Sequence, residues 1–126
     1  MAGAADGSRR VPDAIAEWYV ASGVRQCFGV VGSTNFEVTQ RLVERGVDFV
    51  AARHETNAVV MAHAWALATG EVGLASVHTG PGLTNAATGI AEVAKSRTPS
   101  ARSLVMRKTA DAVACRPAPK RSPRNA

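Results

Sequence analysis

The residues best suited to chemistry lie in three short segments, each of which follows an apolar run. The segments are the turn from Gly32 to Asn35, the tripeptide Arg53-His54-Glu55, and the turn from His78 to Gly82. A carboxylate can hold or move a proton, and glycine turns let bare backbone approach a ligand. If the preceding runs are parallel strands, their carboxyl ends meet at the sheet edge where α/β proteins bind ligands. We therefore expect the three segments to converge on one site.

Glu55 stands between an apolar run and a helical pattern. A helix N-terminus favours a carboxylate and keeps it ionised, so the position alone leaves two interpretations of about equal weight: a charge that complements the helix dipole, or a functional group. A zinc-protease motif is excluded, because the second histidine would have to stand where Ala58 does. His54 and His63 lie about 180° apart around a helix and cannot share a metal ion on one face. No metal site is predicted.

The turn Gly80-Pro81-Gly82 precedes Asn85 at the start of another helical pattern. Such a turn brings backbone close to a ligand or simply reverses the chain. A dinucleotide-binding fingerprint requires a glycine where Asn85 stands, so that match is incomplete. On the residues alone, His78 and Thr79 are more typical of a polar strand terminus than of catalytic groups.

The elements that must position these segments alternate between helix and strand. In the first helical pattern Ile15, Trp18 and Tyr19 recur at helical spacing and predict an inward face. Alternation with short links predicts an α/β fold, a doubly wound parallel sheet with helices on both faces. The helical patterns cover residues 13–22, 36–45, 56–69 and 83–94, and the strand patterns cover residues 24–31, 47–52 and 72–77.

The pattern changes after Pro99, where another apolar strand is expected. Residues 100–126 offer only Leu104-Val105-Met106 between basic residues, followed by a stretch rich in Ala, Pro, Arg and Ser. This composition predicts a basic, disordered tail and a sheet that is incomplete at its C-terminal side. We therefore divide the chain into a flexible N-terminus (1–10), a partial domain (11–99) and the tail (100–126). A tail that begins in mid-pattern is typical of a shifted reading frame or a truncated gene product.

Charge and composition limit the function classes. Of the 126 residues, 1–100 hold eight Lys or Arg against nine Asp or Glu, whereas 101–126 hold seven against one. The alternative to an enzyme is therefore a small α/β domain whose basic tail binds nucleic acid or an acidic partner. No aromatic residue in the tail can stack on bases, so nucleic acid is not the expected partner. Apolar runs are too short for a membrane span and the start lacks a signal peptide, which predicts a cytoplasmic location. Cys27 and Cys115 match no metal-ligand spacing and receive no role.

Four signatures occur in order along the chain: Phe28-Gly29-Val30-Val31-Gly32-Ser33-Thr34-Asn35, then Arg53-His54-Glu55, then Met61-Ala62 with Ala68-Thr69-Gly70, then His78-Thr79-Gly80-Pro81-Gly82-Leu83-Thr84-Asn85. Together they resemble the N-terminal pyrimidine-binding domain of acetolactate synthase-like thiamine-diphosphate enzymes. The resemblance covers about residues 12–99 and is cut short there. One departure is Val31, where that family often has proline.

The resemblance assigns site residues. It implies that Glu55 hydrogen-bonds a ring nitrogen of the cofactor's aminopyrimidine and favours the tautomer that removes the thiazolium proton. His78 becomes a proton donor near the reacting centre. The remaining residues fall into a cofactor-binding group and a substrate-side loop: Gly80, Pro81, Gly82 and Asn85 in the first, and Gly32, Ser33, Thr34 and Asn35 in the second.

The resemblance also implies a reaction class and a partner. The cofactor is thiamine diphosphate, and the substrate is a small 2-oxo acid that a lyase or transferase decarboxylates or ligates. In that family the site forms between the pyrimidine domain of one subunit and the diphosphate domain of another, and the second domain holds magnesium. This chain lacks that domain, so we expect it to be inactive alone and to act in a homo-oligomer or with a subunit that carries the missing domain.

Overall fold

The computed structural model describes residues 10–96, 102–108 and 111–115. Within these ranges helices and strands alternate as far as residue 96, and two strands follow. The elements in chain order are α1 (Val11–Ala21), β1 (Val24–Gly29), α2 (Phe36–Glu44), β2 (Asp48–Ala51), α3 (Glu55–Thr69), β3 (Val72–Ser76), α4 (Pro81–Ser96), β4 (Arg102–Lys108) and β5 (Asp111–Cys115).

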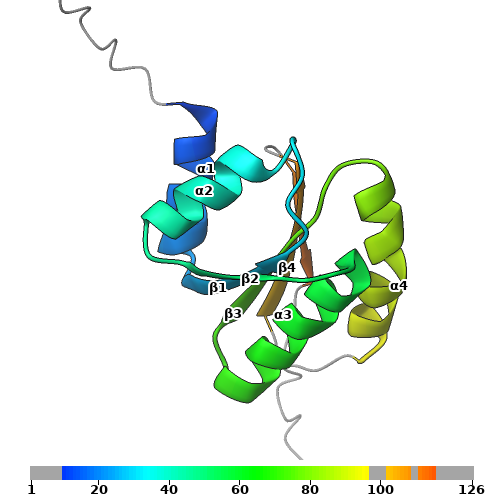
Figure 1. The fold of residues 1–126 in the computed structure, drawn as a ribbon. Helices are drawn as coiled ribbons and strands as arrows, with labels where there is room; N and C mark the ends of the chain where they lie inside the picture. Colours follow the sequence, from blue (N-terminus) through cyan, green and yellow to red (C-terminus); the bar gives the residue numbers. More distant parts are fainter. Residues whose placement is uncertain (1–9, 97–101, 109–110, 116–126) are drawn as a thin grey trace, which may run out of the picture.

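The strands form one sheet in the order β2-β1-β3-β4-β5. β1 pairs in parallel with β2 and β3, and β3 pairs in parallel with β4, whereas β5 is antiparallel to β4. Figure 1 shows α1 and α2 on one face of this sheet and α3 and α4 on the other. The predicted α/β class and doubly wound arrangement are therefore confirmed.

Local signals explain where the helices begin and end. α1 has proline in its first turn, where the N–H that proline lacks would have no acceptor within the helix. α3 is capped by the extended residue His54, whose Nδ1 accepts a hydrogen bond from the Thr56 N–H at 3.2 Å. The same helix ends at Gly70, which has a φ of 75° that side chains rarely adopt. The elements differ from the sequence expectation by one or two residues at their ends.

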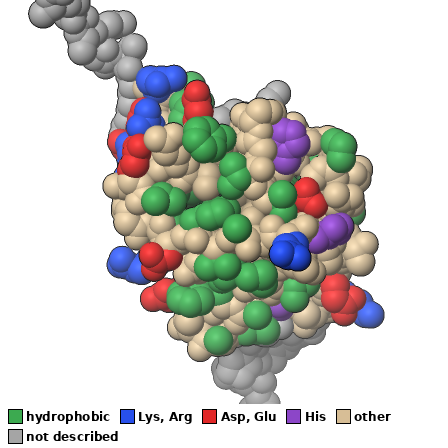
Figure 2. Space-filling view, viewed as in Figure 1, with side chains coloured by type: hydrophobic (Ala, Val, Ile, Leu, Met, Phe, Trp, Pro, Cys, Tyr) green, Lys and Arg blue, Asp and Glu red, His purple; other side chains and the backbone are tan. Residues whose placement is uncertain are grey.

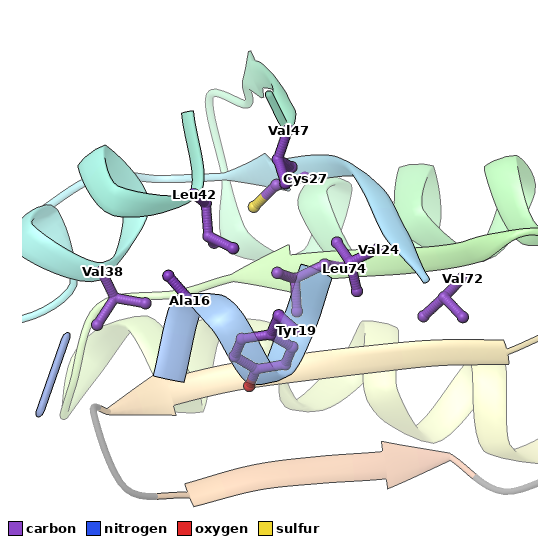
Figure 3. Close-up of a cluster of buried hydrophobic side chains, with 9 residues drawn as sticks. All are labelled: Ala16, Tyr19, Val24, Cys27, Val38, Leu42, Val47, Val72 and Leu74. Atoms are coloured by element: carbon purple, nitrogen blue, oxygen red, sulfur yellow. The ribbon is translucent and has the colours of Figure 1, made fainter. Parts of the chain in front are cut away.

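Each face of the sheet has its own hydrophobic core. Under α1 and α2 the cluster in Figure 3 is built around Tyr19, Leu42 and Leu74. Under α3 and α4 a second cluster is rich in alanine and valine, including Ala62, Ala75 and Val77 among others. Small residues on this second face let α3 approach the sheet closely. At Gly73 the approach is so close that a Cβ would overlap the backbone carbonyl of Ala62.

One core prediction is wrong. Trp18, expected on the inward face of α1, is 55% exposed, whereas Tyr19 is buried as predicted and Ile15 packs against the core. The helix also buries Ala16. The two aromatic rings meet edge to face with centroids 5.1 Å apart, so Trp18 covers the outer edge of Tyr19. The 100° step between neighbouring residues places them on different faces of α1.

The prediction that no strand follows Pro99 is also wrong. Residues 102–108 form β4, which pairs with β3 from Val72 to Ser76, and residues 111–115 form β5 beside it. Without β4, the backbone N–H and C=O groups along that side of β3 would lack partners. Hydrogen bonding to β3 therefore favours a strand at residues 102–108, although their sequence is only weakly apolar. The rest of the predicted tail and residues 1–9 of the predicted flexible N-terminus lie outside the described residues.

The surface shown in Figure 2 carries hydrophobic side chains between scattered charged groups. Between residues 10 and 96 the exposed large hydrophobic residues are Val11, Trp18, Val20, Val31, Phe36, Val43, Val50, Val60 and Leu67. None of the helices in those ranges is both long and apolar enough to cross a bilayer.

Candidate functional site

Glu55 is the first residue of α3, and its side chain is buried, with 8% exposure. One carboxylate oxygen, Oε2, accepts a hydrogen bond from the Asn85 side-chain amide at 3.1 Å. The helix N-terminus adds a favourable field for the negative charge. Glu55 is therefore a buried carboxylate at a helix start, as the first of the two interpretations requires.

The other oxygen, Oε1, faces Gly82 near the start of α4. A Cβ built on Gly82 would stand 3.2 Å from Oε1 and 3.1 Å from the Cβ of His78. Among the described residues, Trp65 Nε1 is the only fully enclosed side-chain nitrogen or oxygen without a hydrogen-bond partner. Oε1 lies next to Gly82, and none of the described residues donates a hydrogen bond to it.

The start of α4 is tied directly to the start of α3. Thr56 donates its hydroxyl proton to the backbone carbonyl of Asn85 at 2.5 Å. A Cβ on Gly89, one turn further along α4, would stand 3.0 Å from the carbonyl oxygen of Thr56, so the two helices pack with backbone close to backbone. This contact holds Asn85 in reach of Glu55.

The turn after β1 is held by a buried amide. Asn35 is 2% exposed, and its Oδ1 accepts a hydrogen bond from the Gly32 N–H at 2.7 Å. Its Nδ2 donates to the carbonyl of Val30 at 3.1 Å and to the Ser76 hydroxyl at 2.8 Å. The predicted substrate-side loop is thereby fastened to the end of β3.

The same turn contacts the segment after β3. Thr34 Oγ1 lies 2.8 Å from His78 Nδ1 and accepts hydrogen bonds from the Thr79 N–H at 3.4 Å and the Thr79 hydroxyl at 3.3 Å. A Cβ on Gly32 would come within 2.5 Å of His78 Nδ1, so glycine is required for the imidazole to occupy this place.

Three other predicted site residues are not buried. Ser33, Gly80 and Pro81 are exposed. Gly80 has a φ of 65°, and its carbonyl accepts hydrogen bonds from the Leu83 and Thr84 N–H groups, which opens α4. Pro81 is the first residue of that helix, where proline is favoured. Gly80 and Pro81 therefore shape the backbone around Gly82 rather than offering side-chain contacts.

Sequence reasoning missed the supporting residues Thr56, Ser76 and Thr39. Ser76 is fully buried at the end of β3, and Thr39 donates its hydroxyl proton to the Asn35 carbonyl at 2.8 Å. A signal for Ser76 was present, since it is the one hydroxyl in the apolar run from Val72 to Val77. A buried hydroxyl in such a strand needs a partner, which here is Asn35.

The described residues contain no group of three or more His, Cys, Asp or Glu side chains placed to hold a metal ion. The nucleic-acid alternative rested on the basic tail, whose side chains lie outside what the structure describes.

Comparisons with known proteins agree with the predicted resemblance. Residues 9–100 match the family described as thiamine pyrophosphate enzyme, N-terminal TPP binding domain. The acetolactate synthase isozyme 3 large subunit of Escherichia coli (strain K12) is 48% identical over 73 residues, which are 57% of this chain and 13% of that protein. The catabolic acetolactate synthase of Raoultella terrigena is 40% identical over 79 residues, 63% of this chain and 14% of that protein.

A third relative is the acetolactate synthase of Bacillus subtilis (strain 168), 37% identical over 81 residues that cover 64% of this chain and 14% of that protein. The chain thus spans about one seventh of the length of these relatives. The family match includes all three segments of the site and every element from α1 to α4. On this evidence the chain belongs to the family of N-terminal TPP binding domains of thiamine pyrophosphate enzymes, which its residues 9–100 match.

Proposed function

We propose that the site binds the aminopyrimidine ring of thiamine diphosphate and that Glu55 hydrogen-bonds a ring nitrogen. The observation that carries this proposal is that the two oxygens of the Glu55 carboxylate have different neighbours. Oε2 accepts a hydrogen bond from Asn85, while Oε1 lies beside Gly82 and accepts none from the described residues. A buried carboxylate with one open oxygen is suited to a ligand that brings its own hydrogen-bonding group.

In this proposal the flat heterocycle of the cofactor lies next to Oε1. Gly82 leaves its Cβ position empty between Glu55 and His78, so backbone rather than a side chain borders the ring. Gly80 and Pro81 set the path of that backbone. We propose that Glu55, Gly80, Pro81, Gly82 and Asn85 form the cofactor-binding group.

Glu55 and His78 have separate roles in this proposal. Glu55 shares a proton at Oε1 with the ring, and Asn85 keeps the carboxylate oriented by occupying Oε2. Thiamine diphosphate, when bound, supplies the carbon nucleophile that protein side chains lack. His78 acts as the proton donor on the opposite side, next to the loop formed by Gly32, Ser33, Thr34 and Asn35, which borders the substrate.

The reaction we propose is that of an acetolactate synthase-like enzyme, which decarboxylates or ligates a small 2-oxo acid. Two Escherichia coli relatives are named acetolactate synthase large subunits, and other relatives are named sulfoacetaldehyde acetyltransferases. Because these names differ, we propose a class of substrate and not a single compound. We propose that the chain acts in a homo-oligomer or with a subunit that carries the diphosphate-binding domain, which would hold the magnesium ion. Exposed apolar residues such as Trp18 and Phe36 are consistent with a covered surface in that assembly.

Backbone amide NMR tests where the cofactor binds. On addition of thiamine diphosphate, we expect the amide shifts to change in residues 32–35, 53–56 and 78–85 and to stay constant on α1. Changes confined to other regions, or none, would contradict the proposed site.

An activity assay tests the proposal that this chain forms only part of the active site. The purified chain with thiamine diphosphate, magnesium and pyruvate should show no turnover. Measurable turnover above that of a Glu55→Gln variant would show that the chain holds a complete active site.

A further inference from the structure

We propose that Thr34 is a positioning residue that fixes the tautomer of His78, so that the neutral imidazole carries its proton on Nε2. The inference rests on the proposed function, because it specifies which nitrogen of His78 can donate a proton in the site. Thr34 itself is exposed, and its hydroxyl contacts the imidazole.

The hydrogen-bonding capacity of the Thr34 hydroxyl determines the direction of the contact. A hydroxyl group has two lone pairs and one proton. Thr34 Oγ1 accepts from both the Thr79 N–H and the Thr79 hydroxyl, which occupies the lone pairs. Its single proton is then available for His78 Nδ1, 2.8 Å away.

A donor aimed at Nδ1 makes that nitrogen the acceptor. In a neutral imidazole one nitrogen carries the proton and the other accepts, so the proton must reside on Nε2. None of the described residues forms a hydrogen bond that occupies Nε2. That N–H is therefore left for a substrate or a solvent molecule.

The surrounding residues keep Thr34 in this position. Asn35 fastens the turn through the Gly32 N–H, the Val30 carbonyl and the Ser76 hydroxyl. Gly32 leaves room for the imidazole, since a Cβ there would collide with Nδ1. The ring thus lies between a glycine and a hydroxyl that belong to the same turn.

Nitrogen-15 NMR of the histidine side chains tests the tautomer directly, at alkaline pH where histidine is neutral. The samples are the unmodified chain, Thr34→Val, which removes the hydroxyl at similar volume, and Thr34→Ser, which retains it. The His78 signals are assigned from their loss in His78→Gln. Because Thr34 is exposed, the variants should fold, and their amide spectra check this.

We expect the unmodified chain and Thr34→Ser to carry the proton on Nε2. In Thr34→Val the share of the Nδ1–H form should rise roughly two- to tenfold, the ratio that one neutral hydrogen bond supports. A proton on Nδ1 in the unmodified chain would overturn the proposal, as would identical spectra for Thr34→Val and the unmodified chain. The samples contain no cofactor, so the result is independent of whether thiamine diphosphate binds.

Discussion

At the scale of single residues, the contact between Glu55 and Asn85 can be measured without any ligand. Asn85→Ala leaves Oε2 of a buried carboxylate without its donor, which should lower the free energy of unfolding by about 1–3 kcal/mol. In a Glu55→Ala background the same substitution should have little further effect. Urea unfolding of the single and double variants yields the coupling energy, expected at about 0.5–3 kcal/mol.

Asn57→Ala is a matched control, because Asn57 is an exposed asparagine on α3. It should change stability by no more than about 0.5 kcal/mol. Additive effects of the Asn85 and Glu55 substitutions would show that the two side chains do not support each other.

A second prediction at this scale concerns the buried groups Cys27 and Tyr19. Burial raises the pKa of the Cys27 thiol from 9.0 to about 12, and burial with the nearby Cys27 raises the pKa of Tyr19 from 10.0 to about 12. Above pH 9 the unfolded chain releases protons that the native chain retains, so stability present below that pH is lost as pH rises towards 12. Each group contributes a slope of up to about 1.4 kcal/mol per pH unit.

Urea unfolding at several alkaline pH values measures this slope, and Cys27→Ala should reduce it. In a Cys115→Ser background, the remaining thiol should react with a thiol reagent only as fast as the chain unfolds. Rapid reaction of the native protein would contradict the burial of Cys27.

Residue identities predicted the principal side chains but not their partners. Glu55 could be singled out because a carboxylate between an apolar run and a helix start is visible in the sequence. The contact of Asn35 with Ser76 joins residues 41 positions apart, and that of Thr56 with Asn85 joins residues 29 apart. Such pairs depend on strand order and helix packing, which spacing along the chain does not specify.

At the scale of secondary structure, the approach of α3 to β3 depends on Gly73. A Cβ at this position would overlap the carbonyl oxygen of Ala62 and stand 2.7 Å from its carbonyl carbon. Backbone in the middle of a helix cannot move aside easily, so Gly73→Ala should lower the free energy of unfolding by about 1–3 kcal/mol. Thermal or urea unfolding measures the loss.

Gly70→Asn is the control for this substitution. Gly70 has open space around it, and asparagine tolerates its positive φ at a helix end. Because side chains are strained at this φ, the substitution should lower the free energy of unfolding by up to about 1 kcal/mol, less than the backbone overlap at Gly73. If Gly73→Ala is as stable as this control, α3 does not pack on β3 as closely as described.

The sequence predicted the elements from α1 to α4 because each has a clear apolar period and a glycine or proline near an end. β4 was missed because its apolar run is short and flanked by basic residues, so composition favoured disorder. The strand forms beside β3, whose backbone groups need a partner. Trp18 was misplaced because helical spacing alone cannot decide which of two adjacent aromatic residues is buried.

At the scale of the whole molecule, the domain provides one part of the site we propose, and its ligand requirements should reflect this. In our proposal the diphosphate and its magnesium ion are held by a domain of another subunit, so cofactor binding by this chain should not depend on magnesium. Thiamine and thiamine diphosphate should bind with dissociation constants within about threefold of each other, since less than 0.7 kcal/mol separates them if the diphosphate is not held. Titrations with and without a chelator measure both effects.

Stronger binding of the diphosphate in the presence of magnesium would show that the chain also recognises the phosphate groups. In that event the cofactor would be held by a larger part of this chain than the three segments described above.

Calorimetric titration of the chain with thiamine diphosphate, compared with Glu55→Gln and the exposed control Glu71→Gln, tests the role of Glu55 most directly. We predict that the unmodified chain and Glu71→Gln bind equally. Glu55→Gln should bind at least roughly tenfold more weakly, as expected for loss of a hydrogen bond to a charged group. Equal binding by Glu55→Gln, or no binding by the unmodified chain, would contradict the proposal that Glu55 engages the cofactor.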